Sequence, residues 1–109
     1  MHNMNTLKNS NVRFVSFFEK GVWYAVGLEF NIVVTGNTKE SAILELFRAL
    51  NGYVESLVKL KGIREEKKIH LLNQKSEPEY EILWKKIMFG EKISSAYKFV
   101  TAGMTPAHA

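Results

Sequence analysis

Residues 36 to 61 carry one long amphipathic pattern, which constrains the fold more than any other part of the chain. Apolar residues recur there at steps of three and four, as one face of an α-helix requires. The stripe consists of Ile43, Phe47, Leu50, Val54 and Leu57 and is widened by Leu46, Tyr53, Val58 and Leu60. The opposite arc is polar and charged. A helix with one apolar side needs a surface to cover, so the rest of the chain must supply that surface.

The ends of this helix are marked by capping residues. Asn37 or Thr38 can accept hydrogen bonds from the free amides of the first turn, and Glu40 complements the positive end of the helix dipole. Gly62 is a suitable terminator. We therefore predict a helix from about residue 38 to 61.

Three short apolar segments precede the helix and predict a sheet. Residues 12 to 18, 22 to 26 and 32 to 35 are rich in β-branched and aromatic side chains. Residues 19 to 21 form the first turn, and residues 27 to 31 interrupt the second and third strands. Because these links are too short for a parallel crossover, we expect an antiparallel meander covered by the helix.

The second half of the chain predicts one further helix, over about residues 77 to 89. Ser76 is the expected cap with Glu79 as its reciprocal partner, Pro78 suits the first turn, and Gly90 is the expected stop. This helix should pack at the edge of the sheet or on a partner. The fold class is therefore α+β, with a three- or four-stranded antiparallel sheet, one long helix and a short helix near the C-terminus.

Other segments of the second half predict less structure. Residues 69 to 72 are either a fourth strand or a buried turn, and residues 97 to 100 are a candidate strand or docking segment. Residues 101 to 109 predict a mobile tail, and the Asn-rich residues 1 to 11 predict a frayed start.

Length and composition favour a single domain over residues 1 to 109. A chain of 109 residues with 46% apolar residues can bury one core without disulfides, and it contains no cysteine. We expect a β-β-β-α core over 12 to 61, a connector and second helix over 62 to 90, and a partly mobile segment over 91 to 109. No apolar run reaches the roughly 20 residues of a membrane helix, and the N-terminus does not resemble a signal peptide, so a cytoplasmic location is expected.

The polar residues predict no catalytic, metal or cofactor site. His2, His70 and His108 are far apart in sequence and lack metal-ligand spacing. Glu19 and Glu29 fall in predicted turns, where carboxylates are usually solvated, so paired acid–base chemistry would require both to reach one pocket. We expect a binding protein and not an enzyme.

Two sets of residues are candidates for macromolecular contact. Aromatic residues fill the core of a small domain more often than they form a surface, and Trp23 or Tyr24 should face the helix. The candidates for a partner surface are Trp84, Tyr97 and Phe99. The net charge of +4 permits attraction to polyanions, and the candidates for a nucleic-acid surface are Lys59, Lys61, Arg64, Lys67 and Lys68. Glu65 and Glu66 lie among these cations and weaken their field.

A hairpin, a third strand and a long helix, with the string Gly-Asn-Thr-Lys-Glu-Ser-Ala at residues 36 to 42, resemble the HicB-like antitoxin family. The resemblance covers about residues 12 to 61. In that family a Gly-Asp-Thr-x-Glu-Glu-Ala-like string leads into the helix of a partial RNase H-like fold without catalytic residues. Residues 27 to 31 differ from the family's Pro-Asp-Leu-Pro-Gly stretch, and residues 69 to 109 show no second recognition helix of a DNA-binding unit.

The resemblance implies the antitoxin component of a toxin–antitoxin system. Such a protein covers the active site of a small ribonuclease toxin by protein–protein contact and often forms a homodimer. Two alternatives come from other classes. One is a small basic nucleic-acid-binding regulatory module, and the other is a residual RNase H-like nuclease that uses Glu19 or Glu29.

Overall fold

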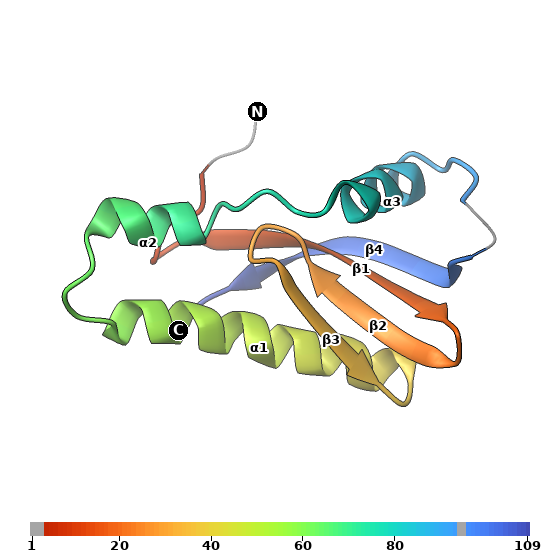
Figure 1. Cartoon of the computed structure of the whole chain (residues 1–109), viewed down its shortest axis with the longest axis horizontal. Helices are drawn as coiled ribbons and strands as arrows, with labels where there is room; N and C mark the ends of the chain where they lie inside the picture. Colours follow the sequence, from red (N-terminus) through yellow and green to blue (C-terminus); the bar gives the residue numbers. More distant parts are fainter. Residues whose placement is uncertain (1–3, 94–95) are drawn as a thin grey trace.

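The chain forms a four-stranded antiparallel sheet with a helix on each face (Figure 1). The computed structural model describes residues 4–93 and 96–109. The strands are β1 (Ser10–Glu19), β2 (Val22–Gly27), β3 (Ile32–Gly36) and β4 (Lys98–Ala107), and the helices are α1 (Lys39–Lys59), α2 (Glu65–Leu71) and α3 (Pro78–Met88). The strands lie in the order β3-β2-β1-β4. The α+β fold with a short helix near the C-terminus is therefore confirmed.

The predicted meander is confirmed, and its first turn has a clear local cause. Lys20 and Gly21 have φ values of 51° and 80°, the left-handed conformations of a two-residue hairpin turn. This turn pairs Glu19 with Val22 and sets the register that continues to the pair of Phe14 with Gly27.

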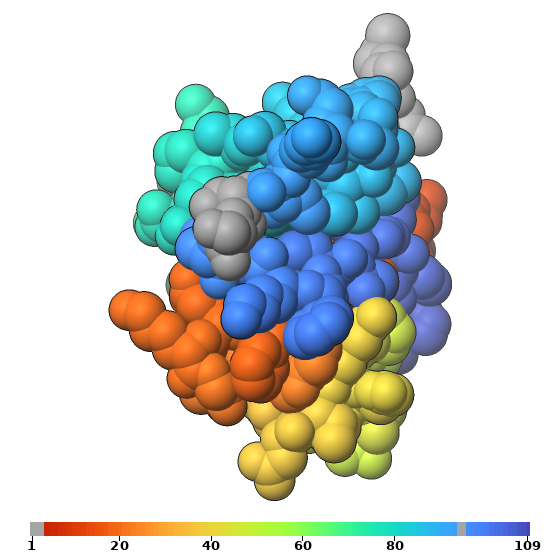
Figure 2. Space-filling view, turned by 90° about the vertical axis from the view of Figure 1, so that its right-hand side faces the viewer, coloured from red at the N-terminus to blue at the C-terminus, as the bar shows by residue number. Residues whose placement is uncertain are grey.

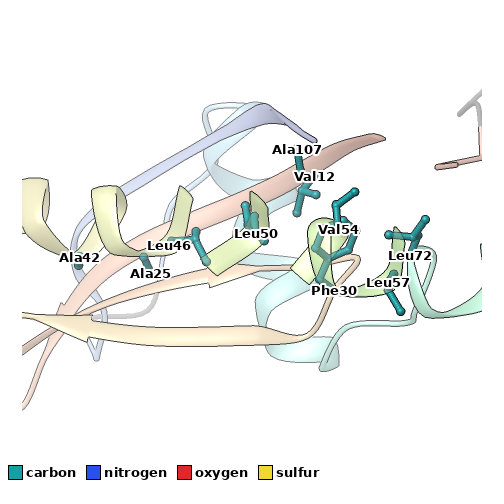
Figure 3. Packing of buried hydrophobic residues seen from close by; sticks show 10 residues of the cluster. All are labelled: Val12, Ala25, Phe30, Ala42, Leu46, Leu50, Val54, Leu57, Leu72 and Ala107. Carbon is teal, nitrogen blue, oxygen red and sulfur yellow. The ribbon is translucent and has the colours of Figure 1, made fainter. Parts of the chain in front are cut away.

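Helix α1 covers one face of the sheet and forms the first core with it (Figure 3). The buried residues of the first core are Val12, Ala25, Phe30, Ala42, Leu46, Leu50, Val54, Leu57, Leu72 and Ala107. The buried stripe of α1 thus runs through Ala42, Leu46, Leu50, Val54 and Leu57, and Phe47 is only half-buried. Val58 and Leu60, predicted to widen the stripe, are 49% and 44% exposed.

The ends of α1 differ slightly from the prediction. Thr38 is the N-cap, and its side chain accepts a hydrogen bond from the Ser41 amide at 3.0 Å. Ser41 returns the contact, since its hydroxyl accepts from the Thr38 amide at 3.1 Å. The helix ends before Leu60, whose extended backbone stops it earlier than Gly62.

Helix α3 covers the opposite face and forms the second core (Figures 1 and 2). The buried residues of the second core are Val15, Phe17, Val26, Leu28 and Leu83. The prediction placed this helix at the edge of the sheet or on a partner, and in the structure it packs on the face formed by β1 and the edge strand β4. The expected cap is wrong, because Glu77 is the N-cap residue and the Ser76 hydroxyl donates to Glu81 instead.

Residues 98 to 107 form β4, so the expectation of a mobile tail is wrong for residues 101 to 107. Strand β4 pairs with β1 from Ser10–Ala107 to Phe18–Lys98, with a register shift near Phe18. Its small side chains give little strand signal on their own, and the pairing with β1 decides their structure. Residues 94–95, which belong to the segment predicted to be partly mobile, lie outside the described residues.

Two further segments differ from the sequence prediction. Residues 65 to 71 form α2, so residues 69 to 71 are helical, and only Leu72 lies in a buried turn. The start of the chain is held by Asn5, which is 5% exposed, so the frayed expectation is wrong from there on. Residues 1–3 lie outside the described residues.

Candidate interaction surface

A cluster of charged groups joins α3 to the sheet on the second-core face. We call Arg13, Glu29, Ser76, Glu81 and Trp84 the arginine cluster. The Nε of Arg13 donates to Glu29 Oε2 at 2.7 Å, and its two terminal nitrogens donate to the two oxygens of Glu81. The guanidinium also lies 5.2 Å from the centre of the Trp84 ring. Each side chain thus has a partner within the fold.

The electrostatics of this cluster favour the charged forms. Burial of Glu81 acts to raise the pKa of its carboxyl, but hydrogen bonds from Arg13 and Ser76 outweigh burial and hold that pKa below its ordinary value. Burial of Arg13 acts to lower its pKa, and the hydrogen bonds to Glu81 and Glu29 outweigh this effect and raise it. Both carboxylates are therefore engaged by Arg13.

Glu19 and Glu29 do not meet in one pocket. Glu29 accepts a hydrogen bond from the Arg13 amide at 2.8 Å, beside the first half of β1, whereas Glu19 ends that strand. Arg13 and Glu19 are six residues apart in the strand, which corresponds to about 20 Å. The structure gives these two acids no shared site.

The histidines also lie apart. His70 is exposed on α2, and His108 follows β4, where its amide donates to Asn51 Oδ1 at 3.0 Å. His2 lies outside the described residues. Among the described residues, no group of three or more His, Asp or Glu side chains could hold a metal ion.

Two of the three candidate partner residues pack within the fold. Trp84 is half-buried, and its indole nitrogen donates to the Gly103 carbonyl at 2.9 Å. The Tyr97 ring lies 4.8 Å from the Phe17 ring, and its hydroxyl donates to Glu79 at 2.6 Å. This hydrogen bond, with burial and the nearby negative charges, raises the pKa of Tyr97 to about 12. Only Phe99, 69% exposed, is largely open to solvent.

Phe99 belongs to a group of rings that we call the aromatic surface, consisting of Phe18, Trp23 and Phe99. The centre of the Trp23 ring lies 5.2 Å from that of Phe18 and 5.9 Å from that of Phe99. A shallow hollow beside Trp23 and Phe99 is also lined by Thr38, Lys39 and Glu40 at the start of α1. Figure 2 views this end of the molecule, where the β1–β2 turn, the start of β4 and the start of α1 come together.

The basic candidates lie at the other end of α1, and two of them have partners within the chain. Lys59 donates to Glu55 at 2.7 Å. Lys68 is only 8% exposed and donates to the Leu60 carbonyl at 2.7 Å. Lys61, Arg64 and Lys67 are exposed. Lys68 is therefore withdrawn from the candidate cationic surface, whereas the Lys59 side chain stays 73% exposed beside Glu55.

Sequence reasoning missed the arginine cluster and the role of Trp23 in the aromatic surface. Arg13 could have been singled out, because a charged residue inside an apolar strand needs a partner when the strand is covered on both faces. Its partners could not have been named, since Glu29 and Glu81 are 16 and 68 residues away along the chain. No comparable sequence feature predicted that Trp23 would take part in the aromatic surface.

No family model, curated protein or solved structure matches this chain. Among the described residues, no helix has the length and apolar character needed to span a bilayer.

Proposed function

We propose that the chain is a non-catalytic binding protein of the HicB-like antitoxin type, which acts by covering the active site of a small ribonuclease toxin. The resemblance over residues 12 to 61 supports the antitoxin assignment. The observation that carries the binding role is the exposed Phe99 in the aromatic surface. We place the activity in the cytoplasm, with which a chain without cysteine is compatible.

The conformation of Phe99 supports a role in contact. Its φ of 53° lies in the left-handed region, which costs a residue with a side chain about 1–2 kcal/mol. Contacts with Phe18 and Trp23 offset part of this cost, but the side chain stays 69% exposed. Strained residues concentrate at functional sites, and exposed aromatic side chains are frequent anchors in protein interfaces.

The distribution of charge favours a protein partner over a nucleic acid. Binding of single-stranded nucleic acid combines stacking on aromatic rings with cations along the same groove. Here the aromatic surface lies at the start of α1, and the exposed nucleic-acid candidates Lys61, Arg64 and Lys67 follow its end. A helix of 21 residues is about 31 Å long, so the two features do not form one groove. Apolar and charged groups side by side, as at Phe99, Lys39 and Glu40, suit a protein surface.

We further propose that the chain acts as a homodimer, as the resemblance implies. In that form each copy presents its own aromatic surface. A toxin would bind each copy without competing for the arginine cluster, which the fold itself uses.

Isolation of the complex and a pair of phenylalanine variants test this function. The tagged chain is purified from its source cell, the stoichiometric partner is identified, and both proteins are then produced separately. We expect a small ribonuclease whose activity is inhibited at a fixed molar ratio. Phe99→Ser should weaken inhibition at least about tenfold, because it removes an anchor side chain.

Phe89→Ser is the matched control, because Phe89 is 74% exposed and follows α3 on the other face of the sheet. It should inhibit like the native chain. Equal inhibition by the Phe99 and Phe89 variants would reject the aromatic surface as the binding site. A partner without ribonuclease activity would reject the antitoxin function. The nucleic-acid alternative would be favoured if a mobility-shift assay showed binding of DNA or RNA and this binding were lost in Lys61→Gln or Lys67→Gln.

A further inference from the structure

Strand β4 forms a long edge of the sheet. It has 10 residues, whereas β3 at the opposite edge has 5. Among the described residues, no strand pairs with its outer side. Edge strands present backbone donors and acceptors that pair readily with another strand unless charges, proline or a cover prevents it.

The register shows which backbone groups of β4 point outward. The Arg13 amide donates to Glu29, and the Arg13 carbonyl accepts from the Leu28 amide at 2.9 Å, so both groups point toward β2. Because backbone groups alternate along an antiparallel strand, those of Phe14 point toward β4, and those of its partner Gly103 point back. The backbone groups of Ala102 and Met104 therefore point to the outer edge.

The position of Pro106 agrees with the outward direction of the Ala102 and Met104 backbone groups. Pro106 lies opposite Asn11, two residues beyond Met104, so its nitrogen also points outward. Proline lacks an amide hydrogen, and a position on the outer edge is one that tolerates it within a sheet. The register shift near Phe18 ends the regular pairing at the other end of β4. The open edge is thus confined to residues 101 to 105.

This open edge lacks the charges that usually protect edge strands. Residues 99 to 107 contain no charged side chain. Met104 is 51% exposed, and Phe99 at the start of the segment is 69% exposed. Two copies with a net charge of +4 each would therefore meet at this edge without placing like charges against each other.

We infer that β4 pairs antiparallel with β4 of a second copy, about a two-fold axis at Gly103. In this register Ala102 of one copy exchanges backbone hydrogen bonds with Met104 of the other, using the groups that point outward. Thr101 lies beside Thr105 of the other copy, a favourable cross-strand pair.

The pairing joins the sheets of two copies into one sheet. It rests on the proposed homodimer and specifies the interface of that dimer, but it does not depend on a toxin. In each copy Phe99 lies four residues before the two-fold axis at Gly103. The two Phe99 side chains are therefore eight residues apart along the joined strands, or about 27 Å. Both aromatic surfaces then lie on the same face and can each bind a partner.

Sedimentation equilibrium of the purified chain tests the dimer without any toxin. The expected mass is twice that of the 12.5 kDa chain. Ala102→Pro should produce the monomer, because it removes an outward amide that β1 does not use. Met104→Lys should raise the dissociation constant at least about tenfold, because it places charges at the edge.

Val33→Lys is the matched control, since Val33 is 50% exposed on the other edge strand, β3. It should remain a dimer, with circular dichroism confirming that all variants fold. A native chain that stays monomeric at about 100 μM, or a dimer lost in Val33→Lys and kept in Met104→Lys, would overturn the inference. Failure of toxin inhibition with an intact dimer would instead reject only the proposed function.

Cysteine pairing tests the register, because the native chain has no cysteine. Opposed residues in a non-hydrogen-bonded antiparallel pair have Cβ atoms about 4.5–5.5 Å apart, close to the range that a disulfide bridges. An equimolar mixture of Thr101→Cys and Thr105→Cys chains should give a crosslinked dimer of the two under mild oxidation. Each variant alone should crosslink much less. Preferential self-crosslinking of Thr101→Cys, or no crosslink in the mixture, would overturn the proposed register.

Discussion

At the residue scale, Arg13 shows how one charged side chain can connect two layers of the fold. It stands in β1 between Val12 and Phe14, its side chain is 15% exposed, and it holds a carboxylate from the β2–β3 loop and another from α3. Removal of one partner from a half-buried ion pair of this kind lowers the stability of the fold, because the remaining charge is left unpaired. The arginine cluster therefore fixes where α3 lies on the sheet.

The lowered pKa of Glu81 predicts that the stability of the fold depends on pH in the acidic range. A carboxyl whose pKa is lower in the folded state contributes stability above its unfolded value and loses that contribution as pH falls through the folded value. The free energy of unfolding should thus decline as pH falls below about 4.5, and Glu81→Gln should reduce this decline. Urea unfolding between about pH 3 and 7 measures it. The exposed Glu66→Gln variant should keep the native slope, and equal slopes in all three proteins would contradict the prediction.

Two leucines of α1 test which side of the helix faces the sheet. Leu50 is fully buried, and Leu44 is 52% exposed. Leu50→Ala should lower the free energy of unfolding by about 2–5 kcal/mol, because it leaves a cavity in the first core. Leu44→Ala should cost less than about 1 kcal/mol. Chemical denaturation measures both, and the reverse order would refute the packing of α1.

At the element scale, β4 is the part of the fold farthest from what its own residues suggest. It contributes Ala107 to the first core, and Val100 and Ala102 pack against the second. It also supplies the carbonyl of Gly103 that receives Trp84. Gly103 closely approaches Phe14, because an added Cβ would lie 3.1 Å from the Phe14 ring and the ring would have to shift. One strand thus completes both faces of the sheet.

Removal of β4 should therefore prevent stable folding. A chain that ends at residue 97 loses the neighbour of β1 and uncovers apolar residues on both faces. We expect no cooperative thermal transition by circular dichroism, whereas a chain that ends at residue 107 should unfold as the full chain does. A cooperative transition in the shorter chain would show that β4 adds little to the fold.

At the scale of the whole molecule, the two cores share one sheet. The residues of β1 alternate between the two cores, with Val12 in the first core and Val15 and Phe17 in the second, so loss of either helix would expose one face of the same strands. Trp23 packs against the first core and Trp84 against the second. The two tryptophans therefore report on the two faces separately.

The shared sheet predicts a single unfolding transition. In Trp23→Phe the remaining indole reports on the second core, and in Trp84→Phe it reports on the first. Within each variant, urea transitions followed by fluorescence and by far-ultraviolet circular dichroism should coincide, as two-state unfolding requires. A fluorescence midpoint that differs from the circular dichroism midpoint would mean that one face opens before the other.

Several helices and strands could be predicted from local sequence patterns alone. The predicted helices at residues 38 to 61 and 77 to 89 match α1 and α3 within two residues at each end, and the first three strands were found at their positions. These segments have strong periodicity and local turn signals, such as Lys20 and Gly21, and such signals depend on neighbours in sequence. The exposed Phe99 was also named from its sequence context.

An amphipathic helix, a meander for it to cover and a second helix with an apolar side could be predicted from the chain, because each depends on nearby residues. The packing of α3 on the opposite face, the pairing of β4 with β1 and the contacts of Arg13 with Glu29 and Glu81 could be learned only from the folded structure. These contacts join residues that are distant along the chain, and β4 has too few large apolar side chains to predict its own pairing. Its strand exists because β1 supplies backbone partners and two cores supply places for its small side chains.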